Sequence, residues 1–233
     1  MVVFGMLGRV LLICIMGLPW PKAAAAPWTL EEGAFYTRAS VARDQVEGLS
    51  AWRADVYSEY GLTDKLTASF KVEAVGYDDA ADFNGQGWRA TVRRKIFQSG
   101  TFNVTIEGGV LEGDAIGGRN GCETLGAELR GGASWSGNWL KQSTFTFAEA
   151  VRREHDGCRR TRYEFGIGQE TFDDIWSVTQ VWLERGSESA DSDKVQSELV
   201  WSRGRADYSI GYRNESGGLF SEESIFLAVA RRF

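Results

Sequence analysis

The sequence predicts an all-β fold, an antiparallel transmembrane β-barrel of about twelve strands that follows a cleaved signal peptide. Three observations lead to this expectation. The chain opens with the layout of an export signal. From residue 31 onward, apolar and polar residues alternate in runs of about ten. Tight turns and longer loops alternate between these runs.

The export signal is expected over residues 1–25. Arg9 precedes an apolar run over residues 10–20, and small alanines follow, which is the three-part layout of a secretory signal peptide. We expect cleavage after Ala25, because a cut after Ala26 would place the rigid ring of Pro27 directly behind the scissile bond. A transmembrane helix is the alternative, but the apolar run is shorter than the roughly 20 residues that span a bilayer. Residues 26–233 then form the barrel.

The mature chain is acidic. The full sequence has 26 basic and 32 acidic residues, and loss of Arg9 and Lys22 with the signal leaves 24 basic against 32 acidic residues, a formal charge of -8. Nucleic acid is therefore not an expected partner, because binding to a phosphate backbone needs an excess of lysine and arginine. No apolar run of about 18 residues follows the signal, so a membrane location would require a barrel.

Each expected strand is close to the ~9–11 residues that a tilted strand needs to cross hydrocarbon. The expected strands are 33–42, 52–60, 66–77, 88–97, 102–111, 125–135, 139–151, 162–171, 175–185, 194–203, 206–213 and 225–233. The expected short connections are 61–65, 98–100, 136–138, 172–174 and 204–205. The expected longer loops are 43–51, 78–87, 112–124, 152–161, 186–193 and 214–224.

The two faces of these strands differ in polarity. In the strand at 52–60, Trp52, Val56 and Tyr60 share one face, and Arg53 and Glu59 share the other. Aromatic residues at strand ends favour a barrel in lipid, because rings gather at the two membrane interfaces. These residues are Trp52, Tyr60, Trp88, Phe97, Phe102, Trp135, Trp139, Trp176, Trp201 and Phe233. A soluble secreted β-protein is the alternative, since soluble sheets also carry aromatic residues.

The chain ends in an apolar alternation over residues 225–233 that closes on Phe233. This ending resembles the C-terminal strand signature of bacterial outer-membrane β-barrel proteins, and the turn at 60–67 is similar to hairpin turns of small porin-like barrels. The resemblance implies an outer-membrane location, contact with outer-membrane lipid, and recognition of Phe233 by the barrel-assembly machinery. It also implies that Ile225, Leu227, Val229 and Phe233 face lipid, whereas Arg231 departs from the usual apolar or aromatic pattern.

Two cysteines remain after loss of the signal, Cys122 and Cys158, and both fall in expected loops at the same end of the barrel. Because the periplasm and the exterior are oxidising, we expect them to form a disulfide. Metal binding is the alternative, but one cysteine and one histidine lack the ligand count of a zinc site. The acidic loop segments at 78–82 and 188–193 lack a calcium-loop spacing, so no metal is expected.

His155 is the only histidine, and its charged surroundings at 152–160 predict a solvated loop residue. This position bears on catalysis, because the chain resembles outer-membrane phospholipase A in inferred strand number, and that enzyme uses a histidine beside a serine. A general base must lie within hydrogen-bond reach of its nucleophile on the barrel wall. None of the expected strands contains a histidine, so the sequence predicts no catalytic residues, no enzyme activity and no cofactor.

Charged residues of both signs occupy the polar strand faces and are candidates for lining a pore. The candidates are Arg53, Asp55, Glu59, Lys71, Glu73, Arg89, Arg93, Lys95, Glu107, Glu128, Arg130, Glu164 and Glu198. They either line a narrow aqueous pore or pair across the lumen and close it. Arg89, Arg93 and Lys95 lie on one strand face without an acid and could form a basic strip that favours anions. Alternatively, Glu73 and Glu107 on the neighbouring strands neutralise them.

The sequence therefore predicts a small porin-like channel for hydrophilic solutes. The alternative is a closed barrel with a structural or surface-interaction role in the cell envelope, motivated by rather short loops and by a lumen able to pair its own charges. A lipid-acting outer-membrane enzyme is a third hypothesis that rests only on the inferred strand number.

Overall fold

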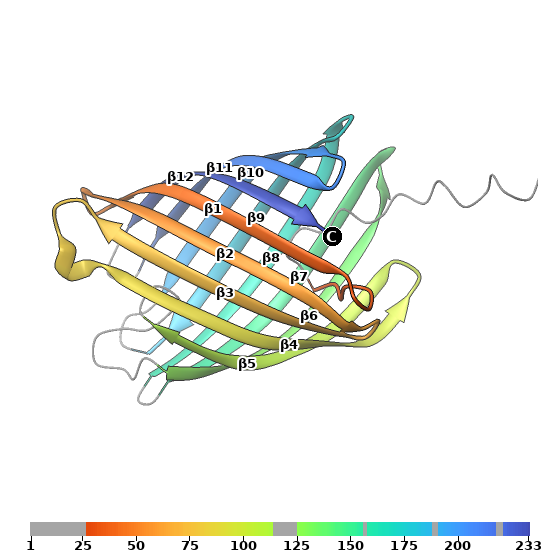
Figure 1. Cartoon of the computed structure of the whole chain (residues 1–233), viewed down its shortest axis with the longest axis horizontal. Coiled ribbons are helices and arrows are strands. Elements are labelled where there is room, and N and C mark those ends of the chain that lie inside the picture. The colour runs from red at the N-terminus through yellow and green to blue at the C-terminus, as the bar shows by residue number, and fades with distance from the viewer. Residues whose placement is uncertain (1–26, 114–124, 156–157, 188–190, 218–220) are drawn as a thin grey trace, which may run out of the picture.

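The computed structural model describes residues 27–113, 125–155, 158–187, 191–217 and 221–233, which form a closed antiparallel barrel (Figure 1). Its strands are β1 (Phe35–Val46), β2 (Leu49–Thr63), β3 (Leu66–Tyr77), β4 (Gly85–Ser99), β5 (Phe102–Gly113), β6 (Leu125–Trp139), β7 (Gln142–His155), β8 (Cys158–Phe172), β9 (Ile175–Gly186), β10 (Ser192–Arg203), β11 (Ala206–Ser216) and β12 (Glu222–Arg232). The predicted twelve-stranded antiparallel barrel is confirmed.

Pairing between the first and last strands closes the sheet. The β1–β12 register runs from Tyr36↔Arg232 to Val46↔Glu222, and the backbone N–H of Phe233 donates to the carbonyl oxygen of Phe35 at 2.9 Å. Closure matters because hydrocarbon offers no hydrogen-bond partners, so an open sheet edge would leave backbone groups unsatisfied. No helix within the described residues is long and apolar enough to cross a membrane.

The two ends of the barrel differ in their connections. At one end, here called the turn end, five two-residue turns join the strands, at 64–65, 100–101, 140–141, 173–174 and 204–205. At the other, the loop end, longer connections occur, including 78–84 with the short helix η1 (Ala81–Phe83). Phe35, which starts β1, and Phe233, which follows β12, both lie at the turn end.

Two of the six expected long loops consist largely of strand residues instead. The loop expected at 43–51 reduces to Glu47 and Gly48, both with positive φ (49° and 85°), the backbone conformation of a tight hairpin turn. In the loop expected at 152–161, residues 152–155 belong to β7 and residues 158–161 belong to β8. Both predictions were wrong because the ladder continues through charged residues, and their polarity was interpreted as a loop.

The prediction for His155 is corrected for the same reason. His155 is the last residue of β7, only 8% exposed, and paired in register with Cys158. It is therefore a buried strand residue and not a solvated loop residue. Its imidazole packs against β6, where a Cβ built on Gly126 would lie 2.7 Å from both Nδ1 and Cε1. Glycine at this position makes room for the ring.

The faces of the strands agree with the sequence pattern. On β2, Trp52, Val56 and Tyr60 are exposed on the outside, whereas Tyr57 and Glu59 are buried on the inside. The same division holds on β12, where Ile225, Leu227 and Val229 are exposed outward, as the resemblance implied. The outer surface is therefore rich in large apolar side chains and the interior in polar ones, the reverse of a soluble barrel.

The disulfide between Cys122 and Cys158 stays a prediction, because Cys122 lies outside the described residues. Cys158 begins β8 at the loop end. We expect peptide mapping of the non-reduced protein to recover one cross-linked peptide that contains both cysteines. Replacing Cys158 by serine should lower the free energy of unfolding by about 2–4 kcal/mol, because the bridge restricts the unfolded chain. Recovery of two free thiols from the native protein would contradict the bridge.

Candidate functional site: the barrel lumen

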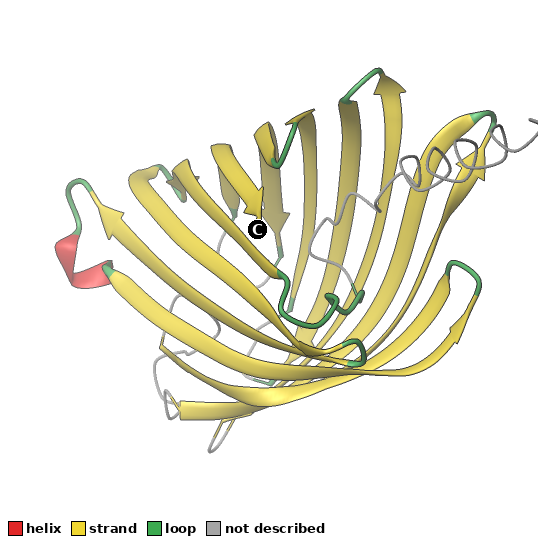
Figure 2. Cartoon of the chain, turned by 45° about the vertical axis from the view of Figure 1, so that its right-hand side comes forward, coloured by secondary structure: helices red, strands yellow, loops and turns green. Residues whose placement is uncertain are grey.

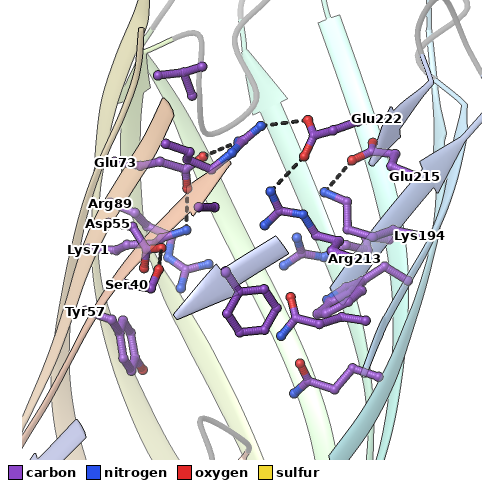
Figure 3. Close-up of a pocket in the computed structure, with 18 of the residues that line it drawn as sticks. Ser40, Asp55, Tyr57, Lys71, Glu73, Arg89, Lys194, Arg213, Glu215 and Glu222 are labelled. Carbon is purple, nitrogen blue, oxygen red and sulfur yellow. Dashed lines mark hydrogen bonds and ion pairs between the residues drawn. The ribbon is translucent and has the colours of Figure 1, made fainter. Parts of the chain in front are cut away.

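A cavity of about 500 Å³ lies inside the barrel. Residues from both walls project into it, and Figure 3 shows Lys71 and Glu73 facing Lys194, Arg213 and Glu215. Its charged lining residues are Arg38, Arg53, Asp55, Lys71, Glu73, Arg89, Arg93, Arg130, Arg153, Arg160, Arg162, Glu164, Glu184, Lys194, Arg213, Glu215 and Glu222. Eleven of these are basic and six are acidic.

Arg53 is the centre of one ion-pair network near the loop end. Its guanidinium donates to Asp44 at 2.7 Å, to Glu73 at 2.7 Å and to Glu222 at 2.6 Å. Glu222 also accepts from Arg213 at 2.7 Å (Figure 3). These contacts tie β2 to β1, β3 and β12, so a single planar guanidinium joins strands from the two ends of the chain.

A second network lies deeper in the wall between β2 and β5. Arg93 donates to Glu107 at 2.7 Å and to Glu59 at 2.9 Å, and these three side chains are 5% exposed or less. Thr91 also donates to Glu107 at 2.6 Å. Buried charges are tolerated only when they are paired and hydrogen-bonded, so this geometry is a condition for folding.

Glu128 on β6 collects three arginines. Arg153 donates to it at 2.5 Å, Arg130 at 3.1 Å and Arg89 at 3.3 Å. Arg130 is also bound to Glu149 at 2.6 Å. The guanidinium groups reach the cavity, whereas the Glu128 side chain is fully buried behind them. Part of the acidic charge of the lumen therefore lies within the wall and part of the basic charge at the cavity surface.

Glu184 on β9 faces a looser group of three arginines. Its carboxylate oxygens lie 3.9 Å from Arg153, 3.7 Å from Arg160 and 3.9 Å from Arg162. These separations are ion-pair distances but exceed those of direct hydrogen bonds. All four side chains line the cavity. Arg153, Arg160 and Arg162, here called the arginine group of β7 and β8, thus bring three positive charges to the cavity surface.

The turn-end half of the lumen is different, because it carries an apolar cluster. Phe145, Phe147, Trp176 and Val178 pack together there, and Phe145 stacks on Trp176 with ring centroids 5.8 Å apart. Glycines on β8 provide the space for the phenylalanine rings: a Cβ on Gly166 or Gly168 would lie within 2.2 Å of a ring atom. A second cavity of about 90 Å³ lies beside this cluster.

Comparison with solved structures matches this barrel to membrane proteins of bacteria. A KdgM porin in complex with disordered oligogalacturonate has a TM-score of 0.60 at 8% identity, with 84% of this chain and 99% of that chain covered. The COG4313 outer membrane channel from Pseudomonas putida F1 has a TM-score of 0.59 at 12% identity, with 91% and 99% covered. The fold is that of a bacterial outer-membrane β-barrel. At these identities the likeness establishes the fold alone.

A third solved structure is also similar to this barrel, whereas comparisons of the sequence found no match. LpxR from Salmonella typhimurium matches with a TM-score of 0.54 at 10% identity, and covers 84% of this chain and 99% of that chain. No protein-family model matches the sequence, and no curated protein matches it. The outer-membrane fold together with the apolar outer surface indicates a location in the bacterial outer membrane, where that surface contacts lipid.

The candidate pore-lining residues all lie on inward strand faces, but they do not all reach a cavity. Those that line the larger cavity are Arg53, Asp55, Lys71, Glu73, Arg89, Arg93, Arg130 and Glu164, and Glu198 lines the smaller one. Glu59, Glu107 and Glu128 lie in the wall, where they hold arginines. Lys95 lines neither of these two cavities.

The basic strip considered for Arg89, Arg93 and Lys95 is largely neutralised. Arg93 pairs with Glu107 on the neighbouring strand, as the alternative hypothesis supposed, and Arg89 pairs with Glu128 two strands away. Glu73 pairs with Arg53 on β2 and with Lys71 on its own strand. The arginine group of β7 and β8 therefore contributes basic charge to the cavity beside Arg89 and Arg93 of β4.

Several lumen residues were assigned to loops in the sequence and are therefore missing from the candidates. Asp44, Arg153, Arg160, Glu215 and Glu222 all belong to the ends of strands near the loop end. A usable signal was present, because the strict alternation of inward and outward positions continues through these charged segments. The expected strands were too short because the charged residues at their ends were interpreted as loop residues.

Replacing Glu107 by glutamine should lower the free energy of unfolding by about 3 kcal/mol or more, because it leaves a buried arginine short of one counter-ion. Urea unfolding of the protein in lipid vesicles measures this effect. The matched control is Glu223→Gln on β12, where the side chain is exposed. Equal stability of the two variants would contradict a structural role for the Arg93 network.

Proposed function

We propose that the barrel is a small channel for hydrophilic solutes in the outer membrane. The observation that carries this proposal is the cavity of about 500 Å³ inside the barrel, which is lined by charged side chains rather than filled by apolar ones. Polar lumens that exclude lipid and admit water are the structural basis of conduction in outer-membrane barrels. The likeness to porin and channel structures agrees with this proposal.

A preference for anions follows from the lining. Basic residues outnumber acidic ones at the cavity surface, and carboxylates such as Glu128 and Glu107 lie behind guanidinium groups in the wall. The nearest charges determine most of the potential that a permeating ion meets. The KdgM structure is described as a complex with oligogalacturonate, an anionic sugar chain, which is compatible with this preference.

Planar-bilayer recordings test the channel and its selectivity together. We expect stepwise currents with a reversal potential on the anion side in a KCl gradient. The double variant Arg160→Gln/Arg162→Gln should reduce the anion-to-cation permeability ratio by about two-fold or more, because it removes two cavity-lining charges. Arg185→Gln is the control, since that arginine is at the same end but is 51% exposed and pairs with Asp193. Cation selectivity of the parent, or an unchanged ratio, would contradict the assignment.

A closed barrel with a structural role in the envelope is the second candidate. It is favoured by the ion pairs that join inward residues of different strands, such as Arg38 with Glu198 and Arg53 with Glu222. An intact barrel that carries no current in any recording would select this candidate over the channel. The Arg53 network would then stabilise the barrel by connecting β2 to β1, β3 and β12.

We further propose that the barrel is not an enzyme, although one structural neighbour, LpxR, is a lipid-modifying enzyme. His155 lies on a strand and not in a loop, which reopens it as a candidate base. However, its ring packs tightly against Gly126 on β6, and this contact supports a packing role. Wild-type protein with no measurable hydrolysis of lipid A or phospholipid supports this proposal, and hydrolysis that His155→Ala abolishes would refute it.

We also propose that the last strand carries the signal for barrel assembly. Phe233 is exposed, its ring lies 5.6 Å from Phe35, and the Arg231 guanidinium lies 4.8 Å from its centroid. Arg231 can therefore occupy the atypical position by stacking on the terminal ring. Deleting Phe233 should reduce the amount of heat-modifiable barrel in outer-membrane fractions several-fold, whereas Phe35→Leu should not. Unchanged assembly of the deletion would contradict the role.

A further inference from the structure

The segment before β1, residues 27–34, does not leave the barrel but folds back inside its turn end. The backbone N–H of Gly33 donates to Gly61 at 2.8 Å, and that of Gly61 donates to Ala34 at 2.9 Å. Glu31 passes so close that a Cβ on Gly61 would lie 1.9 Å from its carbonyl oxygen. In Figure 2 this segment is the green loop near the centre of the picture that leads into the first strand. We call residues 27–34 the strap.

Leu30 fixes the strap to the wall formed by β1, β2, β3 and β12. Its backbone N–H donates to the hydroxyl of Thr67 at 2.9 Å, and Thr67 is fully buried. Its side chain packs against the cluster of Tyr36, Tyr57 and Ala230. A hydrogen bond and an apolar contact at one residue define both the depth and the orientation of the segment.

Trp28 carries the strap across to the opposite wall. Its indole meets Phe145 edge-on with ring centroids 5.6 Å apart, and Phe147 at 6.5 Å. Its carbonyl oxygen accepts a hydrogen bond from buried Arg93 at 2.7 Å. Pro27 is fully buried and lies against β6, where a Cβ on Gly132 would lie 3.0 Å from the Pro27 Cβ. The strap therefore spans the lumen from β1–β3 to β6–β7.

The internal space is smaller toward the turn end, where Trp28 of the strap packs on the apolar cluster. The larger cavity of about 500 Å³ and the smaller one of about 90 Å³ share Arg38, Gln180 and Gln196 in their linings. The smaller cavity continues toward the turn end along β9 to β12, and Phe145 and Trp176 border it. Trp28 packs on this aromatic cluster. A solute that moves from the larger cavity into the smaller one therefore passes Phe145 and Trp176, the rings on which Trp28 packs.

We propose that the strap, through Trp28, forms the constriction that sets the conductance and the size limit of the barrel. This inference rests on the proposed channel function, but it assigns a separate role: the arginine group selects by charge, and Trp28 selects by size. The Trp28 indole packs edge-on against Phe145 and Phe147 and so adds its volume to the apolar cluster that borders the smaller cavity. Water and small solutes then use the narrow passage beside β9 to β12.

Two variants weaken the attachment of the strap to the wall by removing different contacts. Trp28→Ala removes the indole that packs on Phe145 and Phe147. Thr67→Val keeps a side chain of nearly the same volume but removes the acceptor for the Leu30 N–H, so it loosens the strap without changing its sequence. The matched control is Trp52→Ala, which removes an indole from the outer surface, where Trp52 is 55% exposed. Heat-modifiable migration on gels establishes that each variant folds.

The readouts are single-channel conductance and the swelling rate of proteoliposomes in sugars of increasing size. Trp28→Ala should raise the conductance by about two-fold or more and admit larger sugars, because the narrowest section dominates the resistance of a pore. Thr67→Val should shift both readouts in the same direction by a smaller amount, and Trp52→Ala should shift neither. A silent parent with a conducting Trp28→Ala variant also supports the strap as the closing element.

Two results would overturn the proposal and are distinguishable from each other. If the parent conducts and Trp28→Ala has the same conductance and size limit, the strap is not the constriction, and the channel function stands. If neither the parent nor either strap variant conducts although all are folded, both the constriction and the channel are refuted, and the closed barrel remains.

Discussion

The structure depends on one constraint: a closed sheet with an apolar outer surface can place its charged side chains only inside. Once inside, each charge needs a partner, because isolated ions in a low-dielectric interior are strongly destabilising. Arg53 meets three carboxylates from three strands, and Arg93 meets Glu107 and Glu59. The ion pairs therefore connect neighbouring and distant strands of the barrel, and their charged groups also line its lumen.

The same constraint explains why the two halves of the lumen differ. Where arginines and carboxylates pair, a polar cavity remains between them. At the turn end, Phe145, Phe147 and Trp176 turn inward instead, and an inward apolar surface is stable only if something apolar covers it. The strap supplies that cover through Trp28, and its backbone finds hydrogen-bond partners in Arg93 and Thr67. The wall residues and the strap are therefore complementary.

The sequence was sufficient to predict the number of strands, their antiparallel pairing and the polarity of their faces, because each follows from local alternation. It was not sufficient to predict where the strands end, because charged residues can continue a strand as well as form a loop. Charged residues at the loop end, such as Arg153 and Glu222, were expected in loops but continue the ladder. Ion-pair partners also depend on register across several strands: Arg89 pairs with Glu128 and not with a residue on an adjacent strand. The strap escaped prediction because it has no periodicity.

The most direct test of the inside-outside assignment is thiol labelling at neighbouring positions of β10. Gln196 lines both cavities, whereas Val195 is exposed on the outer surface. Gln196→Cys and Val195→Cys would be made in a Cys122→Ser/Cys158→Ser background, reconstituted in liposomes and treated with a small charged thiol reagent. The polar-lumen barrel predicts rapid labelling at 196 and protection by lipid at 195. Protection at 196 with labelling at 195 would contradict it. That result would indicate a soluble barrel in which position 195 faces water and position 196 is shielded from it.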